Sequence, residues 1–307
     1  MKPTKLSKPA KNTCYPRVTK CGLAHYSVCM TSDLTSLKGL TILMSGGSRG
    51  IGLAIAKRAA ADGASIVLLA KTAQAHDKLE GTIYTAQEEI EVAGGKALPV
   101  VGDVRNDDDV AAAVARAVET FGGIDIVVNN ASAIDLRKTP DLDMKKYDLM
   151  QDINARGSFL MAKTALPHLL KSQHPHILTM SPPINLDPKW AGGHVAYTIS
   201  KYSMSLVTLG LAEELKEHGV GVNSLWPATL IDTAAIRAMP HGPAMAARGR
   251  SIDIVGDAAH AILTSDPREL TGRFLTDEEI LKMKGITDLG HYAATPGNEE
   301  LIPDAFL

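Results

Sequence analysis

The sequence has 307 residues, of which 45% are hydrophobic, and this composition is sufficient for a buried core in one large domain or two small ones. The formal net charge is −2, but residues 1–30 hold six Lys or Arg and no acid, which leaves 26 basic and 34 acidic side chains in the rest. This acidic body argues against a nucleic-acid-binding surface, and apolar stretches of only strand length predict no membrane span.

The first residues differ from the rest in composition. All three cysteines, Cys14, Cys21 and Cys29, lie there, so the remaining chain has no thiol for a disulfide, a metal site or nucleophilic catalysis, and a reducing, cytoplasmic compartment is expected. A continuous apolar stretch of the kind found in secretory signals is absent from this leader. We therefore expect residues 1–36 to be a disordered extension or an overlong start rather than a transit peptide, and residues 37–307 to form a single domain.

From residue 40 onward, short β-branched runs alternate with longer helical patterns. Strands are expected at residues 41–45, 65–70, 97–104, 124–132, 176–181, 220–227 and 273–275. Helices are expected at residues 53–63, 88–93, 107–122, 147–170, 195–217 and 257–264. This alternation predicts an α/β fold with one Rossmann-type, doubly wound parallel sheet flanked by helices.

The segment SGGSRGIG, residues 45–52, lies between the first expected strand and the first expected helix. Glycines there allow a tight turn, and the helix N-terminus then presents its N–H groups to a pyrophosphate. On the glycines alone a methyltransferase is the alternative. The Gly-x-x-x-Gly-x-Gly spacing resembles the short-chain dehydrogenase/reductase family, over residues 37–274. The predicted cofactor-binding residues of the turn are Ser45, Gly46, Gly47, Ser48, Arg49, Gly50, Ile51 and Gly52.

The end of the second expected strand predicts the cofactor. It reads Ala70-Lys71, without the carboxylate that would bind the ribose hydroxyls of NAD. Lys71 and Arg49 place positive charge where a 2′-phosphate would lie, which favours NADP, although both could be ordinary surface cations. The family resemblance implies that Asp103 and Val104 hold the adenine. It also implies that Asn130 and Ala131, in NNAS, pass beside the nicotinamide ribose.

Tyr197 and Lys201 are four residues apart, so on a helix both side chains lie on one face. A tyrosine is a poor base at neutral pH, but a nearby ammonium stabilises the phenolate. The pair therefore predicts a general acid/base that exchanges a proton with an alcohol or carbonyl while hydride moves to or from the nicotinamide. Resemblance to the family further implies that Lys201 binds the nicotinamide ribose and that Asn154 joins a proton relay behind it.

The stretch MSPPINLDPKW raises a question about the substrate-orienting serine. The family places a serine just past the fifth strand, and an ungapped count puts Pro182 there, with Ser181 one position earlier. In one interpretation Ser181 is an ordinary strand-end serine and the polar clamp is missing. In the preferred one, the prolines fix a turn that brings Ser181 forward to the substrate.

Three stretches, SPPINLDPKW, KTAQAHDKLEGTIYTAQEEI and GKALPVVGDVR, resemble the hydroxysteroid dehydrogenase-like 2 branch of the family and its bacterial relatives. No sterol-carrier domain is expected, because the 307 residues leave no room for one. The predicted function is an NADP-dependent oxidoreductase acting on a small hydrophobic alcohol or carbonyl. A non-catalytic NADP(H)-binding sensor or assembly subunit is the alternative. The family resemblance implies a homodimer or homotetramer, and no metal or nucleic acid is expected.

Overall fold

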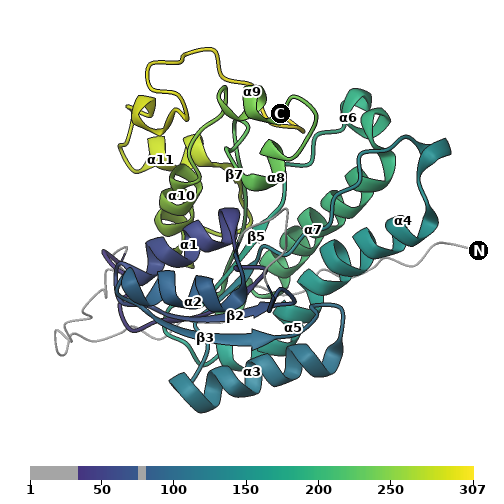
Figure 1. Ribbon diagram of the computed structural model, residues 1–307. Helices are drawn as coiled ribbons and strands as arrows, with labels where there is room; N and C mark the ends of the chain where they lie inside the picture. The colour runs from purple at the N-terminus through teal and green to yellow at the C-terminus, as the bar shows by residue number, and fades with distance from the viewer. Residues whose placement is uncertain (1–33, 75–80) are drawn as a thin grey trace, which may run out of the picture. The chain divides into compact units, whose positions relative to one another are not determined.

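A computed structural model describes residues 34–74 and 81–307, whose strands form one parallel sheet (Figure 1). The strands are β1 (Thr41–Ser45), β2 (Ser65–Ala70), β3 (Lys96–Val101), β4 (Ile126–Asn129), β5 (His176–Met180), β6 (Gly221–Trp226) and β7 (Phe274–Thr276). Their order across the sheet is β3-β2-β1-β4-β5-β6-β7. The predicted α/β fold with a doubly wound parallel sheet is confirmed. The disorder expected for residues 1–36 concerns mainly residues outside the described ones.

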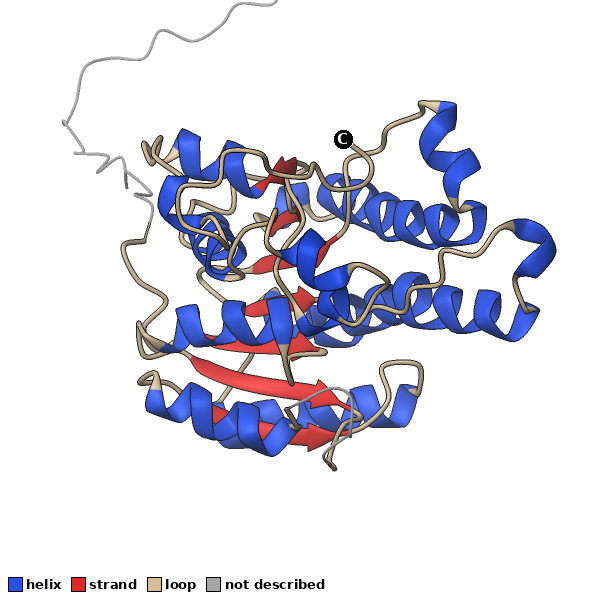
Figure 2. Cartoon of the chain, turned by 45° about the horizontal axis from the view of Figure 1, so that its top comes forward, coloured by secondary structure: helices blue, strands red, loops and turns tan. Residues whose placement is uncertain are grey.

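Helices cover both faces of the sheet, as Figure 2 shows. Their bounds are α1 (Gly50–Ala60), α2 (Ile83–Val92), α3 (Asp107–Phe121), α4 (Met144–Met150), α5 (Gly157–Leu169), α6 (Pro188–Gly193), α7 (Val195–Glu214), α8 (Ala234–Arg237), α9 (Gly242–Ala246), α10 (Asp253–Leu263) and α11 (Asp277–Met283). Among the described residues, no helix is long and apolar enough to cross a bilayer.

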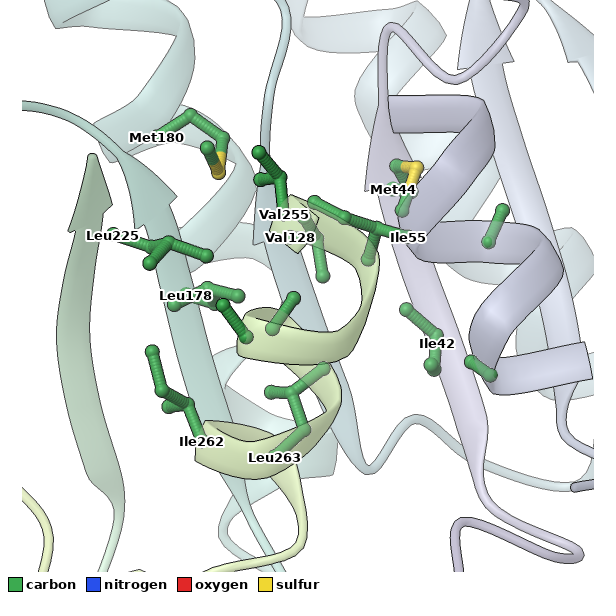
Figure 3. Packing of buried hydrophobic residues seen from close by; sticks show 14 of the residues in the cluster. Ile42, Met44, Ile55, Val128, Leu178, Met180, Leu225, Val255, Ile262 and Leu263 are labelled. Atoms are coloured by element: carbon green, nitrogen blue, oxygen red, sulfur yellow. The ribbon is translucent and has the colours of Figure 1, made fainter. Parts of the chain in front are cut away.

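The two largest apolar clusters of the core lie one on each face of the sheet. On one face, α1, α2 and α10 pack on the strands, and Figure 3 shows Ile55 of α1 beside Val255 of α10 and Val128 of β4. On the other face, α3, α5 and α7 supply the second cluster. Helices cover β1 and β2 on both faces, so TILMS and SIVLLA are buried at every position, and most of their residues are apolar.

The sheet changes direction between β1 and β4, because the chain runs outward from β1 to β3 and then returns to pair β4 with β1. Connections from the two halves leave on opposite faces, so a crevice opens at the carboxyl ends of these strands. Ser45 ends β1 and Asn129 ends β4, and the two are partners in the register. The glycine turn and NNAS therefore meet at this crevice.

One long helix was expected over residues 147–170, and this expectation is wrong in detail. The chain forms α4, then a π-helical turn at Gln151–Arg156, then α5. A π-helix inserts an extra residue into the turn, and such insertions occur often at functional sites. Short helices α6, α8, α9 and α11 were also not expected.

Candidate active site

The glycine turn lies directly against the loop that follows β4. Gly46 has φ +75°, and a Cβ there would lie 2.8 Å from the Cα of Ala131. A Cβ on Gly52 would lie 2.4 Å from Asn130 Nδ2. Asn130 Nδ2 donates to the Gly46 carbonyl oxygen at 2.6 Å, and Ser45 Oγ accepts from the Asn130 N–H at 3.3 Å. Glycine is required at both positions because the two backbones approach too closely for a side chain.

A cleft of about 460 Å³ opens beside this turn. Ten of the residues predicted to bind cofactor line it: Gly46, Ser48, Arg49, Gly50, Ile51, Lys71, Asp103, Val104, Asn130 and Ala131. Ser45 and Gly52 lie behind the turn and support it through the contacts above. Gly47 faces the core, because a Cβ there would lie 2.5 Å from Leu68 Cδ2. The cradle of small residues at a helix N-terminus fits a dinucleotide pyrophosphate.

The end of the cleft beside β2 and β3 contains a charge cluster, of which the sequence patterns predicted Lys71 and Asp103 but not Arg105. Lys71 Nζ pairs with Asp103 Oδ2 at 3.0 Å, and Arg105 pairs with the same oxygen at 2.6 Å. Hydrogen bonds from Arg105, assisted by Lys71, hold the pKa of the Asp103 carboxyl well below its usual value. The missed residue is Arg105, whose signal was its position two residues after the strand-end aspartate. Thr233, Ala234 and Ala235 also line the cleft and belong to no motif that was recognised.

Asn154 lies in the π-helical turn and is fully buried. Its Oδ1 accepts from the Ala133 N–H at 2.7 Å, and its Nδ2 donates to the Ala133 carbonyl at 2.9 Å. Nδ2 also lies 2.9 Å from Ser200 Oγ, on α7. Asn154 thus joins the loop after β4 to the helix that holds Tyr197 and Lys201. Its part in a proton relay stays a prediction.

Tyr197 and Lys201 lie one turn apart on α7, and both are buried, with relative exposures of 7% and 3%. Lys201 Nζ donates to the Met180 carbonyl at 2.8 Å and lies 5.0 Å from the Trp226 ring centre. Burial lowers the pKa of the Lys201 ammonium to about 7, although the charge of Asp304 acts in the opposite direction. Burial, with a smaller contribution from Asp304, raises the pKa of the Tyr197 phenol well above its usual value. The pKa of Tyr197 is thus raised in this structure, not lowered by Lys201 as expected.

Ser181 occupies a different position from the preferred interpretation. Its side chain is fully buried, and its Oγ lies 2.8 Å from Ser224 Oγ on β6. Ser224 Oγ in turn donates to Thr208 Oγ1 at 2.9 Å, which completes a chain of hydroxyls inside the protein. This arrangement favours the other interpretation, in which Ser181 is a strand-end serine.

A third apolar cluster surrounds Tyr197, and its centre is Phe306. Phe306 is 1% exposed, and its ring centre lies 6.2 Å from that of Tyr197. Asp304, two residues earlier, acts electrostatically on both Tyr197 and Lys201. Sequence patterns could not reveal these contacts, because about a hundred residues separate Phe306 from α7 and no motif joins them.

Comparison with known proteins identifies the family. The short chain dehydrogenase family model matches residues 40–242. The chain belongs to the short-chain dehydrogenase family. Hydroxysteroid dehydrogenase-like protein 2 of Xenopus tropicalis is 54% identical to this short-chain dehydrogenase over 278 residues, 91% of this chain and 66% of that protein. The human protein of that name is 53% identical over the same shares. The chain therefore spans 66% of the length of these curated relatives, and the predicted resemblance to their branch is confirmed.

Solved structures agree with this assignment. A short-chain dehydrogenase of Mycobacterium thermoresistibile is 50% identical, with a TM-score of 0.84 over 89% of this chain and 96% of that one. A metagenomic short-chain oxidoreductase in complex with NADP is 24% identical, with a TM-score of 0.65 over 79% of this chain and 98% of that one, and it shares the fold.

Residues 34–74 and 81–307 contain no group of three His, Cys, Asp or Glu able to hold a metal ion.

Proposed function

We propose that this short-chain dehydrogenase is an NADP(H)-dependent oxidoreductase for a small hydrophobic alcohol or carbonyl, with Tyr197 as general acid/base. The observation that carries the proposal is the pair of buried ionisable groups, Tyr197 and Lys201, on α7, one turn apart. Burial of a phenol and an ammonium is unfavourable for the charged forms, and such perturbed groups concentrate at functional sites.

The proton chemistry follows from these two side chains. Tyr197 Oη keeps its proton at neutral pH, since burial raises its pKa, so it is able to donate to a carbonyl oxygen. Lys201 Nζ has a pKa of about 7, and it is therefore able to take up and release a proton near neutral pH. When bound, NADPH would supply hydride to the carbonyl carbon. The product is then an alcohol, and the reverse reaction returns the proton to Tyr197.

NADP is the proposed cofactor because Lys71, and no carboxylate, follows the end of β2. Lys71 and Arg105 both pair with Asp103, and Asp109 accepts from the Asp103 N–H at 2.7 Å, so the two cations lie beside two carboxylates. A 2′-phosphate would gain from the Lys71 ammonium, whereas the carboxylate that suits a free ribose is absent from the end of β2. The turn residues Gly46 and Gly52 would hold the pyrophosphate against the N-terminus of α1.

The test is turnover of a panel of carbonyls with NADPH and of alcohols with NADP⁺. Tyr197→Phe should abolish turnover while NADPH still binds, because only the phenolic hydroxyl is lost. Tyr84→Phe is the matched control, since Tyr84 is exposed on α2. Tight NADPH binding without Tyr197-dependent turnover of any compound would instead favour the non-catalytic sensor.

We also propose a homodimer or homotetramer. Exposed apolar side chains on α5 and α7, namely Phe159, Leu206 and Leu209, support it, since neighbouring copies could cover them. Light scattering of the purified chain tests the state, and a monomer would refute it. We also propose a cytoplasmic location. Its support is the sequence, in which all three cysteines lie within residues 1–30 and the rest of the chain has no thiol for a disulfide.

A further inference from the structure

Phe306 lies inside a box of aromatic side chains beside the proposed acid/base. Its ring centre is 5.4–6.2 Å from the centres of five other rings. They come from α6, from α7 with its N-cap and from β6, and we call them the aromatic box: Trp190, His194, Tyr197, Tyr202 and Trp226. Rings at such separations and tilts pack favourably on a further flat ring.

The aromatic box covers most of Tyr197, of which 7% is exposed. A substrate ring bound beside the phenol needs space that these side chains now fill. Among the ring neighbours of Tyr197, His194 caps α7, whereas Phe306 lies in a segment without helix or strand. Phe306 is therefore the neighbour whose movement would make room for a ring.

The segment 303–307 is joined to the domain by side-chain and backbone hydrogen bonds and by the packing of Phe306. Trp226 Nε1 donates to the Ala305 carbonyl at 2.9 Å, and Asn185 Nδ2 donates to the Phe306 carbonyl at 3.3 Å. Its backbone joins the protein through the Asp304 N–H and Ala228 carbonyl, 3.1 Å apart, and through a single bridge between Pro303 and Thr229. Phe306 also has φ +73°, a conformation that is unfavourable for a bulky residue. Release would relieve that strain.

One wall of the box contains a polar group with nothing bound to it. Trp190 Nε1 is buried, and in the described part of the chain it has no hydrogen-bond partner. A buried donor without an acceptor is costly, and an oxygen atom on a ligand would satisfy it. The apolar phenyl ring of Phe306 offers no such atom.

We propose that the aromatic box is the binding pocket for the flat ring of an aromatic carbonyl or alcohol, and that residues 303–307 are a displaceable plug whose Phe306 ring stands where the substrate ring binds. The inference rests on the proposed function for its chemistry, because the box includes Tyr197. It adds the class of substrate, a ring compound with a polar oxygen, and a segment that must move before such a ring is bound.

Binding to the box can be followed without turnover. The chain has two tryptophans, and both lie in the box, so intrinsic tryptophan fluorescence reports its occupancy. Acetophenone and 2-octanone are the probes, since both are ketones of eight carbons and only the first has a ring. Acetophenone should change the fluorescence of the wild type at lower concentration than 2-octanone does.

Phe306→Ala should lower the acetophenone concentration needed at least tenfold, because the plug no longer competes with the ligand. Leu307→Ala is the matched control on the same segment, and it should bind like the wild type, since Leu307 is 38% exposed. Circular dichroism shows whether Phe306→Ala is folded. A folded variant that binds acetophenone no better than the wild type would overturn the proposal, because Phe306 would then not compete with the ligand.

A measurement on the wild type covers the case in which Phe306→Ala does not fold. Saturating acetophenone should speed amide hydrogen exchange at Ala305, Phe306 and Leu307, and unchanged exchange with the ligand bound would refute the plug. The two proposals fail separately. Ring binding without Tyr197-dependent turnover removes the proposed function alone, whereas Tyr197-dependent turnover of open-chain ketones without ring binding removes this inference alone.

Discussion

Gly52 and Gly210 offer a matched pair of glycine-to-alanine substitutions, because both lie inside helices, α1 and α7. A Cβ on Gly52 would lie 2.4 Å from Asn130 Nδ2 and 2.7 Å from the Gly46 carbonyl oxygen, whereas one on Gly210 would meet nothing within 4 Å. Gly52→Ala must therefore disrupt the 2.6 Å hydrogen bond from Asn130 to Gly46. Leaving a buried polar group unpaired lowers the free energy of unfolding by about 1–3 kcal/mol, and overpacking lowers it by about as much. The higher helix propensity of alanine raises it by about 1 kcal/mol.

We expect Gly52→Ala to lower the free energy of unfolding by about 3 kcal/mol, or roughly 6–12 °C in Tm for a chain of this size. Gly210→Ala should raise it by about 0.5–1 kcal/mol. NADPH affinity, measured by fluorescence titration, should fall about tenfold or more in Gly52→Ala alone, since 1.4 kcal/mol of lost binding is a factor of ten. If Gly52→Ala melts with the wild type and binds NADPH equally well, the close contact between α1 and the loop after β4 is not what positions the turn.

Three further changes test other parts of the site. Lys71→Ala should weaken NADPH about fivefold and NADH hardly at all, since exposed ion pairs contribute up to about 1 kcal/mol; equal losses for both cofactors would count against a phosphate contact. Asn154→Ala should lower the free energy of urea unfolding by about 2–4 kcal/mol, because Ala133 loses two buried partners, and an unchanged midpoint would contradict those bonds. Burial lowers the pKa of His176 from 6.5 in the unfolded chain to about 3 in the folded protein. Between these values the unfolded chain binds a proton that the folded protein does not, so the free energy of unfolding should fall as pH drops from 6.5 towards 3. His176→Gln should reduce that slope, and a slope equal to that of the wild type would assign it to other groups.

Local sequence patterns predicted the central strands correctly, because β1 and β2 are short apolar runs bounded by polar or glycine residues. The first helix begins at Gly50, three residues before the predicted Leu53, and Gly50 itself has φ +57°, a value that suits glycine where the turn enters the helix. The interruption between α4 and α5 was not predicted, because a π-helical turn changes hydrogen bonding without changing apolar periodicity.

In the candidate site, residues of local motifs were predicted, whereas contacts between distant segments were not. Residues in contiguous motifs, such as the glycine turn, were found because the motif states both the position and the chemistry. Phe306 and Asp304 were missed because their contacts with α7 depend on the path of the last segment through space. For Ser181, the structure favours the interpretation that was not preferred. The direction of its hydroxyl depends on the hydrogen-bond partner on β6, which the sequence around Ser181 does not contain.

The internal hydroxyl chain from Ser181 to Thr208 bears on the stereochemistry of the product. In the proposed reaction, a carbonyl held only by the Tyr197 phenol is free to turn about that one hydrogen bond, and it then presents either face to hydride. With the Ser181 hydroxyl engaged by Ser224, handedness must come from the shape of the surrounding walls. Ketones that fill those walls should therefore give one enantiomer in excess, while small open-chain ketones should give mixtures closer to racemic.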